Sequence, residues 1–271
     1  MPKRSLGSIV FSHGNSFPAG TYRLLLDAWR NAGYTVHAVE KYGHNPKYPV
    51  TNHWPRLRDQ LIQFTETHVE EPVFLVGHSM GGMVTLIYAG TFPEQVSALV
   101  VLDGVTVLPN TTTAPAHERI AKYVGQLDRL DDREPRRYRT IEEAAAQMMM
   151  HNKRLSPELA QHLATFAARR NADNTYSWKF DPYQRAMAPH RLSPEDHVSL
   201  WARITCPTLL LGAEESFLPS AKAEGLAGYF QQARSETISG AGHWLHHDKP
   251  DEVLSLMRTF LGLTDKGALA G

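Results

Sequence analysis

The segment around Ser79 constrains this chain of 271 residues more than any other feature of its sequence. Ser79 is the centre of the pentapeptide Gly77-His78-Ser79-Met80-Gly81, and the apolar residues 73–76 before it are typical of a short buried strand. Residues 83–89 are apolar and favour a helix directly afterwards. We therefore expect Ser79 to lie in a sharp, strained turn between strand and helix, with its hydroxyl facing a cleft.

Short apolar runs alternate with helical patterns along most of the chain. Between the runs, apolar residues recur at helical spacing, as in the series Leu25, Ala28, Trp29 and Ala32. Strands that alternate with helices predict an α/β fold with a parallel sheet covered on both faces. Six strands are expected, at residues 8–12, 35–39, 73–76, 98–102, 208–211 and 236–239.

The alternation stops after Asp103 and resumes near Cys206, which predicts an inserted cap. Residues 1–103 and 204–271 would form the core, and residues 104–203 the helical cap. Its helices are expected near residues 116–126, 140–150, 156–170 and 193–203. The methionines 148–150 and the aromatic residues Tyr176, Trp178 and Phe180 could pack the cap on the core or line an apolar substrate pocket.

Charge and cysteine content narrow the functional classes. The chain holds 28 Lys and Arg residues and 28 Asp and Glu residues, so no excess positive charge favours nucleic acid as a partner. Cys206 is the only cysteine, which excludes an intrachain disulfide and fits a reducing cytoplasm. The apolar run near the N-terminus is too short for a signal-peptide core or a membrane span.

Four separated motifs resemble those of the α/β-hydrolase family, in the order that the family has them: residues 11–15, 77–81, 212–219 and 240–244. The resemblance implies that Ser79 is a nucleophile and that His243, in Gly240-Ala241-Gly242-His243-Trp244, is its base. It also implies an oxyanion hole formed by the backbone N–H groups of Asn15 and Met80, with Ser16 as the alternative to Asn15.

Two positions compete for the acid that orients the histidine. The loop Gly212-Ala213-Glu214-Glu215-Ser216-Phe217-Leu218-Pro219 resembles the family's acid loop, and its spacing selects Glu215, where the family usually has Asp. Glu214 could act in place of its neighbour. Asp103, at the end of the strand 98–102, occupies the position that some members use instead. Glu215 is the preferred prediction and Asp103 is the alternative.

Other residues near these motifs are expected to line the site without carrying a proton. They are His13, His78 and Trp244. His246, His247 and Asp248 lack the spacing that would put metal ligands on one helix face. The sequence shows no cofactor-binding glycine pattern and no metal cluster, and the expected reaction requires neither.

The resemblance implies a serine hydrolase acting on a small-molecule substrate. The preferred reaction cleaves an ester or thioester of a small to medium apolar substrate through an acyl-enzyme on Ser79. A carbon–carbon bond hydrolase or a lactonase would use the same residues, and a ligand receptor of the same fold would bind without turnover. Family members often begin with an antiparallel hairpin, but few residues precede Ser8, so we expect an all-parallel sheet without it.

Overall fold

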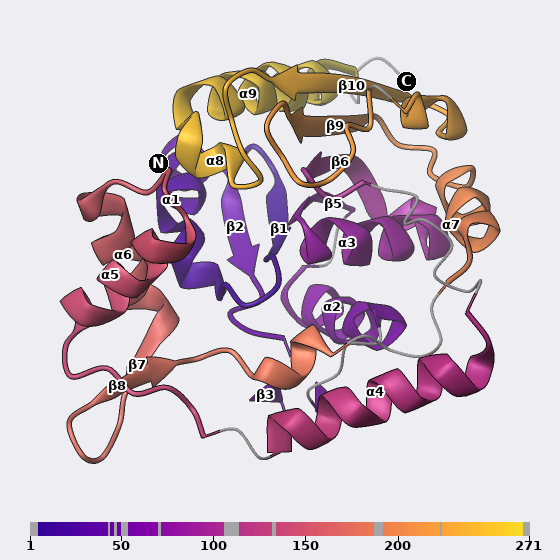
Figure 1. Cartoon of the computed structure of the whole chain (residues 1–271). Coiled ribbons are helices and arrows are strands. Elements are labelled where there is room, and N and C mark those ends of the chain that lie inside the picture. The colour runs from indigo at the N-terminus through magenta and orange to yellow at the C-terminus, as the bar shows by residue number, and fades with distance from the viewer. Residues whose placement is uncertain are drawn as a thin grey trace.

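A six-stranded sheet forms the centre of the computed structural model, which describes residues 5–42, 44–45, 48–49, 54–69, 72–105, 114–131, 134–186, 192–222 and 224–267 (Figure 1). The strand order is β10-β9-β6-β5-β1-β2, and every neighbouring pair is parallel. The predicted six-stranded parallel sheet is therefore confirmed. Its strands are β1 (Ser8–Ser12), β2 (Thr35–Ala38), β5 (Val73–His78), β6 (Val96–Leu102), β9 (Thr208–Ala213) and β10 (Ala233–Ile238).

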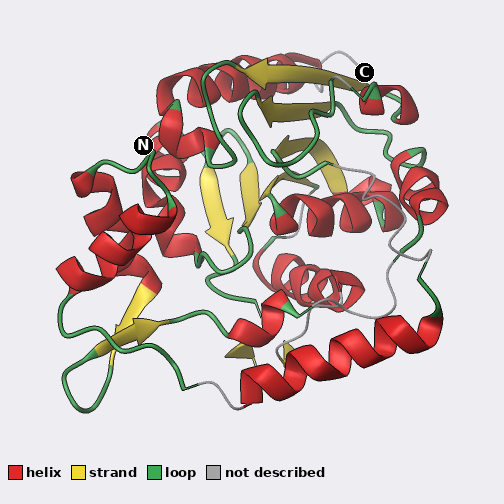
Figure 2. Ribbon diagram, viewed as in Figure 1, coloured by secondary structure: helices red, strands yellow, loops and turns green. Residues whose placement is uncertain are grey.

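Alternate residues of the strands enter two different hydrophobic clusters. Val10 packs in one cluster, whereas Ile9 and Phe11 pack in the other, as the period of two along a strand requires. The first cluster includes residues of α2 (Trp54–His68) and α3 (Met80–Thr91), and the second those of α1 (Arg23–Asn31) and α9 (Pro250–Gly267). Both faces of the sheet are thus covered by helices, as Figure 2 shows.

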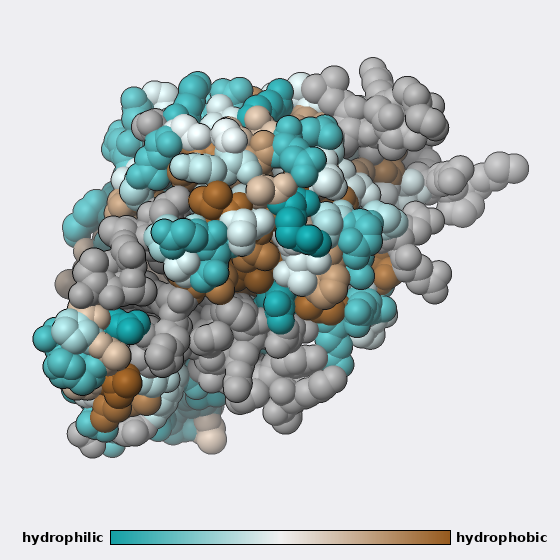
Figure 3. All heavy atoms as spheres, turned by 90° about the vertical axis from the view of Figure 1, so that its right-hand side faces the viewer, coloured by the Kyte–Doolittle hydropathy of each residue, from teal (hydrophilic) through white to brown (hydrophobic). Residues whose placement is uncertain are grey.

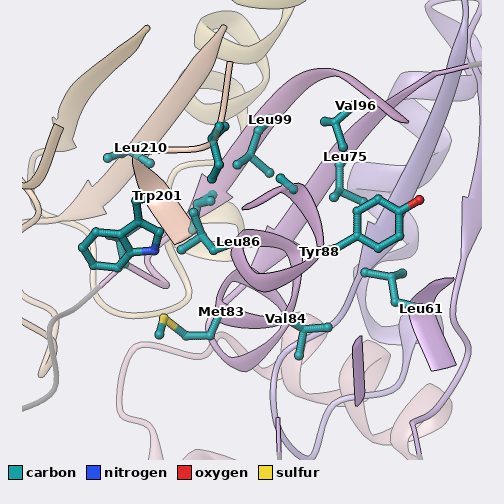
Figure 4. Packing of buried hydrophobic residues seen from close by; sticks show 14 of the residues in the cluster. Leu61, Leu75, Met83, Val84, Leu86, Tyr88, Val96, Leu99, Trp201 and Leu210 are labelled. Carbon is teal, nitrogen blue, oxygen red and sulfur yellow. The ribbon is translucent and has the colours of Figure 1, made fainter. Parts of the chain in front are cut away.

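The helix that follows Ser79 is buried on all sides. Residues 80–90 of α3 are all buried, because α3 lies between the sheet, α2 and α7 (Pro194–Trp201). Trp201 is fully buried in the same cluster, near Leu210 and Leu86 (Figure 4). Packing from several directions fixes the position of α3, and therefore that of the turn at its N-terminus.

The strand order reverses direction at β1. From β1 the chain goes to β2 on one side and then returns to β5 on the other side. The loops after β1 and β5 leave the sheet from adjacent strands at the same edge. In open α/β sheets, ligands bind at such a point, beyond the carboxyl ends of the strands.

The segment between β6 and β9 contains helices, as expected, but also a hairpin that was not expected. Its helices are α4 (Ala116–Asp131), α5 (Ile141–His151), α6 (Pro157–Ala167) and α7. An antiparallel pair, β7 (Ala168–Arg170) and β8 (Tyr176–Trp178), follows α6 where the sequence analysis extended the helix to residue 170. Two aromatic residues that favour strands, Tyr176 and Trp178, lie in β8, whereas β7 continues an alanine-rich pattern that favours a helix.

A third hydrophobic cluster lies within this segment. Met148, Met149, Tyr176 and Trp178 pack against buried residues of α5 and α6 and against Tyr138. The Trp178 Nε1–H also donates a hydrogen bond to the Tyr138 hydroxyl at 3.0 Å. These side chains therefore pack within the segment itself, an arrangement that differs from both expectations, packing on the core and lining a substrate pocket.

Several short elements complete the described chain. A second antiparallel pair consists of β3 (His44–Asn45) and β4 (Tyr48–Pro49), and α8 (Leu245–Asp248) precedes α9. In the described part of the chain, turns of 3-10 helix lie at Ala19–Tyr22, Pro93–Gln95, Pro182–Arg185 and Leu226–Tyr229.

The coloured residues in Figure 3 show a surface where hydrophobic groups are interspersed with hydrophilic ones. Among the described helices, none combines the length and the apolar character that crossing a membrane requires.

We predict that Trp201→Ala strongly destabilises the protein, because the fully buried indole at the end of α7, packed with residues of α3 and β9, would be replaced by a cavity. The expected loss is roughly 3 to 5 kcal/mol in the free energy of unfolding, measured by urea denaturation. Leu24→Ala is the matched control, since Leu24 is 59% exposed and should change this free energy by less than about 0.5 kcal/mol. Equal effects of the two variants would contradict the packing described here.

Candidate active site

Ser79 occupies a strained turn between β5 and α3, as predicted. Its φ and ψ angles are 54° and −122°, in a region that non-glycine residues rarely adopt. The turn lies so close to the end of β1 that a Cβ atom on Gly81 would be 2.1 Å from the Ser12 carbonyl oxygen. Glycine is therefore required at position 81, and this contact joins the Ser79 turn to the loop after β1.

A continuous chain of hydrogen bonds connects Ser79, His243 and Asp103. The Ser79 Oγ lies 2.9 Å from His243 Nε2, and His243 Nδ1 lies 2.6 Å from Asp103 Oδ2. With Asp103 ionised, Nδ1–H donates to the carboxylate and Nε2 is left to accept the proton of the Ser79 hydroxyl. The side chains of His243 and Asp103 are 9% and 3% exposed, so water screens the contact between them weakly.

The end of β6 positions the Asp103 carboxylate. Asp103 has a φ of 42°, and its N–H donates to the Leu211 carbonyl oxygen of β9 at 2.7 Å. Its Oδ1 accepts the Ala213 N–H at 3.2 Å, and its Oδ2 accepts the Ser216 hydroxyl at 2.5 Å. Donors on two sides hold the carboxylate toward His243.

The preference for Glu215 as the acid is corrected by this geometry. Asp103 occupies the place beside His243 Nδ1, whereas the Glu215 carboxylate, 55% exposed, forms an ion pair with Arg154. The spacing pointed to a loop that does contact Asp103. The residue of this loop that makes the contact is Ser216, whose hydroxyl donates to Asp103 Oδ2. Glu215 N–H donates to the Ala241 carbonyl oxygen at 2.9 Å, so this residue supports the loop that carries His243.

Glu214, the neighbour considered as a substitute acid, also supports that loop. Its carboxylate accepts the Ser239 hydroxyl at 2.6 Å and the Gly240 N–H at 2.8 Å. These hydrogen bonds hold the pKa of Glu214 below its usual value. Both glutamates therefore tie the loop after β9 to the loop after β10.

The predicted oxyanion residues lie on either side of the Ser79 turn. Met80 is the first residue of α3, where backbone N–H groups lack acceptors within the helix. Asn15 lies in a tight turn closed by a hydrogen bond of 3.3 Å from the Phe17 N–H to the Gly14 carbonyl oxygen. Ser16 in the same turn has a φ of 71°.

His13 and His78 are buried and hydrogen-bonded through both ring nitrogens. His13 Nδ1 lies 2.8 Å from the Gly14 carbonyl oxygen, and its Nε2 accepts the Tyr42 N–H at 3.1 Å. His78 Nε2 donates to the His243 carbonyl oxygen at 3.0 Å, and its Nδ1 lies 2.8 Å from the Tyr22 hydroxyl. These pairings make His13 and His78 supports of the surrounding loops.

Tyr22 was not identified from the sequence. Its hydroxyl accepts the Gly14 N–H at 3.0 Å and donates to His78, so it connects the loop after β1 to the Ser79 turn. Burial raises the pKa of this hydroxyl, which keeps it protonated. A tyrosine beside a 3-10 turn carries no distinctive sequence signal, because its role depends on residues 8 and 56 positions away.

Two aromatic side chains lie near the His243 ring, and a third contacts one of them. Phe217 is 77% exposed, and its ring centroid is 4.4 Å from that of His243. Trp244 was predicted to line the site, and its ring centroid lies 6.1 Å from that of His243. It also makes an edge contact with Phe17, at 5.4 Å between the ring centroids. We call Phe17, Phe217 and Trp244 the aromatic rim.

Comparison with known proteins identifies related chains. The model of the alpha/beta hydrolase family matches residues 9–256. Esterase YbfF of Escherichia coli is 26% identical over 227 residues, which cover 82% of this chain and 80% of the esterase. The sn-1-specific diacylglycerol lipase ABHD11 of Mus musculus is 25% identical over 264 residues, which cover 95% of this chain and 81% of the lipase.

A solved structure also resembles the whole chain. The thioesterase domain from the curacin biosynthetic pathway superimposes with a TM-score of 0.79 at 20% sequence identity, covering 96% of this chain and 92% of that domain. At this level of identity the likeness concerns the fold.

A cluster of buried histidines lies behind His243. His246 is 4% exposed, and neither of its ring nitrogens has a hydrogen-bond partner among the described residues. It stacks on Tyr22 and contacts the rings of His78 and His247. Burial, reinforced by the neighbouring histidines, lowers the pKa of His246 and of His78 well below the usual value, and it lowers the pKa of His247 to about 4.

These histidines predict a loss of stability in acid. The unfolded chain binds protons below a pH of about 6.5, whereas the folded protein resists them until the pH reaches the lower pKa values. The contribution of these neutral histidines to the free energy of unfolding is therefore fully present above pH 6.5 and decreases as the pH falls toward about 4. For His247 alone the decrease is about 3 kcal/mol at most.

The measurement is urea denaturation at pH values of about 7.5 and about 5.5. His246→Phe keeps an aromatic ring but removes a titrating group. The decrease in the free energy of unfolding between the two pH values should therefore be smaller in this variant than in the wild type. His68→Gln is the control, because His68 is exposed at the end of α2. An unchanged pH dependence in His246→Phe would refute this account.

Proposed function

Since the chain belongs to the alpha/beta hydrolase family, we propose that it is a serine hydrolase that cleaves an ester or thioester through an acyl-enzyme on Ser79. One observation carries this proposal: Ser79, His243 and Asp103, from three separate loops, form one chain of hydrogen bonds. Nucleophilic serine catalysis requires a base within hydrogen-bond distance and a group that orients this base.

In the proposed reaction, Ser79 Oγ attacks the substrate carbonyl carbon while His243 Nε2 takes the hydroxyl proton. Asp103 stabilises the resulting imidazolium, and the N–H groups of Asn15 and Met80 donate to the oxyanion. His243 then gives its proton to the leaving alcohol or thiol as the bond to the carbonyl carbon breaks. A water molecule, deprotonated by His243, hydrolyses the acyl-enzyme and restores the Ser79 hydroxyl.

The aromatic rim supports a small to medium apolar substrate. An exposed phenylalanine in contact with the base, together with Phe17 and Trp244, offers apolar surface beside the reacting bond. The names of the relatives, an esterase and a diacylglycerol lipase, support a carboxylic ester. We further propose that residues 104–203 form a cap beside this site, and that the protein works in a reducing cytoplasm, as its single cysteine suggests.

Two other functions remain as alternatives. Cleavage of a carbon–carbon bond or of a lactone would use the same three residues. A receptor that binds without turnover is less favoured, because the Ser79, His243 and Asp103 contacts are complete.

A fluorophosphonate probe should label the wild-type protein covalently at Ser79, and Ser79→Ala should abolish labelling. Hydrolysis of p-nitrophenyl esters should fall to the background rate in the same variant, because no nucleophile remains. A series of acyl chain lengths would then define the pocket. Failure of the wild type to label or to hydrolyse any ester, carbon–carbon or lactone substrate would favour the receptor function instead.

The identity of the acid is tested by Asp103→Asn and Glu215→Gln. Asp103→Asn should lower kcat roughly a thousandfold or more, because an amide cannot stabilise the imidazolium or fix the tautomer. Glu215→Gln should lower kcat less than about tenfold, since its carboxylate lies away from the His243 ring. The reverse order of the two effects would contradict the assignment of Asp103.

A further inference from the structure

A single arginine of the proposed cap reaches the loop that carries His243. Arg154 lies between α5 and α6, and its guanidinium contacts three segments of the core. Nη1 donates to the Gly240 carbonyl oxygen at 3.1 Å and lies 3.5 Å from Asp248 Oδ2. Nη2 forms the ion pair with Glu215. The loops after β9 and β10 and the helix α8 thus share one cation.

Asp248 transmits this contact to the residue before His243. Its Oδ2 accepts the Gly242 N–H at 2.7 Å, and its side chain is 8% exposed. The Arg154 side chain also packs on Gly242 directly, since a Cβ atom there would lie 3.1 Å from Arg154 Nε. A buried carboxylate is costly without partners, and Arg154 and the Gly242 N–H supply a cation and a donor for Asp248.

The backbone of His243 is therefore held on both sides. On the N-terminal side, Gly242 is fixed by Asp248 and Arg154. On the C-terminal side, the carbonyl oxygen of His243 accepts a hydrogen bond from His78 Nε2. His78 belongs to the core beside Ser79, whereas Arg154 belongs to the proposed cap. An arginine of the proposed cap thus contacts the loop that holds His243 beside Ser79.

We propose that Arg154 is a positioning residue that aligns His243 with Ser79 and makes this alignment depend on the docked cap. The inference rests on the proposed serine hydrolase function. Movement of the segment that carries Arg154 would leave the carboxylates of Glu215 and Asp248 without their shared cation and would release Gly242. The base would then lose the fixed geometry on which proton transfer from Ser79 depends.

The test compares Arg154→Ala with Arg137→Ala. Arg137 is a matched control, because it is another arginine of the same segment, and among the described residues its ion pair is with the exposed Asp173 at 2.6 Å. With p-nitrophenyl acetate, Arg154→Ala should lower kcat by about 10- to 100-fold and change KM by less than about threefold. Arg137→Ala should leave both kcat and KM unchanged. Arg154→Lys should give an intermediate kcat, because one ammonium group can replace only some of the contacts of the guanidinium.

A change in KM alone would overturn the proposal, since it would make Arg154 a substrate-binding residue. A kcat within about twofold of the wild type in Arg154→Ala would also overturn it. Asp248→Asn keeps an acceptor for the Gly242 N–H but removes the charge, so it should lower kcat less than Arg154→Ala. The double variant should have about the same kcat as Arg154→Ala alone. If the two decreases in kcat multiplied instead, Arg154 and Asp248 would act independently, which would contradict the proposal.

A proton NMR measurement separates this proposal from the proposed function. The proton between His243 Nδ1 and Asp103 should give a downfield signal, assigned by its loss in His243→Gln. In Arg154→Ala this signal should broaden or shift while the unfolding curve shows a folded protein, and in Arg137→Ala it should not change. An unchanged signal in Arg154→Ala would refute the positioning role. Absence of fluorophosphonate labelling and of turnover in the wild-type protein would instead refute the hydrolase function.

Discussion

The close backbone contact between the end of β1 and the start of α3 determines the rest of the site. Gly81 lies against the Ser12 carbonyl oxygen so tightly that even a methyl group has no space. This contact places the turn of Asn15 beside the N-terminus of α3, where Met80 begins the helix. The strained φ of Ser79 is maintained because α3 is buried along its length and cannot shift to relieve it.

His243 is held differently from Ser79. Ser79 is fixed by packing of a helix, whereas His243 lies in a loop and is fixed by polar contacts: Asp103 and Ser79 at its ring, and His78 and the Arg154 and Asp248 pair at its backbone. Hydrogen bonds are directional and can break one at a time, so the histidine loop is the part of the site that changes most easily. Dependence of its alignment on a distant arginine follows from this difference.

The sequence predicted those features that depend on local patterns. Periodicity located the six strands, and the glycines around Ser79 and His243 located their turns. The preference for Glu215 differs from the geometry, in which Asp103 contacts His243, because the choice depends on which carboxylate faces His243 across neighbouring strand ends. Tyr22 and Arg154 were missed for the same reason, since their partners are distant in sequence. Hairpin β7–β8 was missed because its first strand continues a helical pattern.

The buried histidines show how the site restricts the conditions in which the fold is stable. His78 must stay neutral to donate one N–H to His243 and accept from Tyr22, and burial provides this by excluding water. The same exclusion leaves His246 without hydrogen-bond partners among the described residues, although its ring packs well on Tyr22. Alignment of His243 and the sensitivity of the fold to acid therefore depend on the same buried cluster, because each proton that enters this cluster opposes the folded geometry of the site.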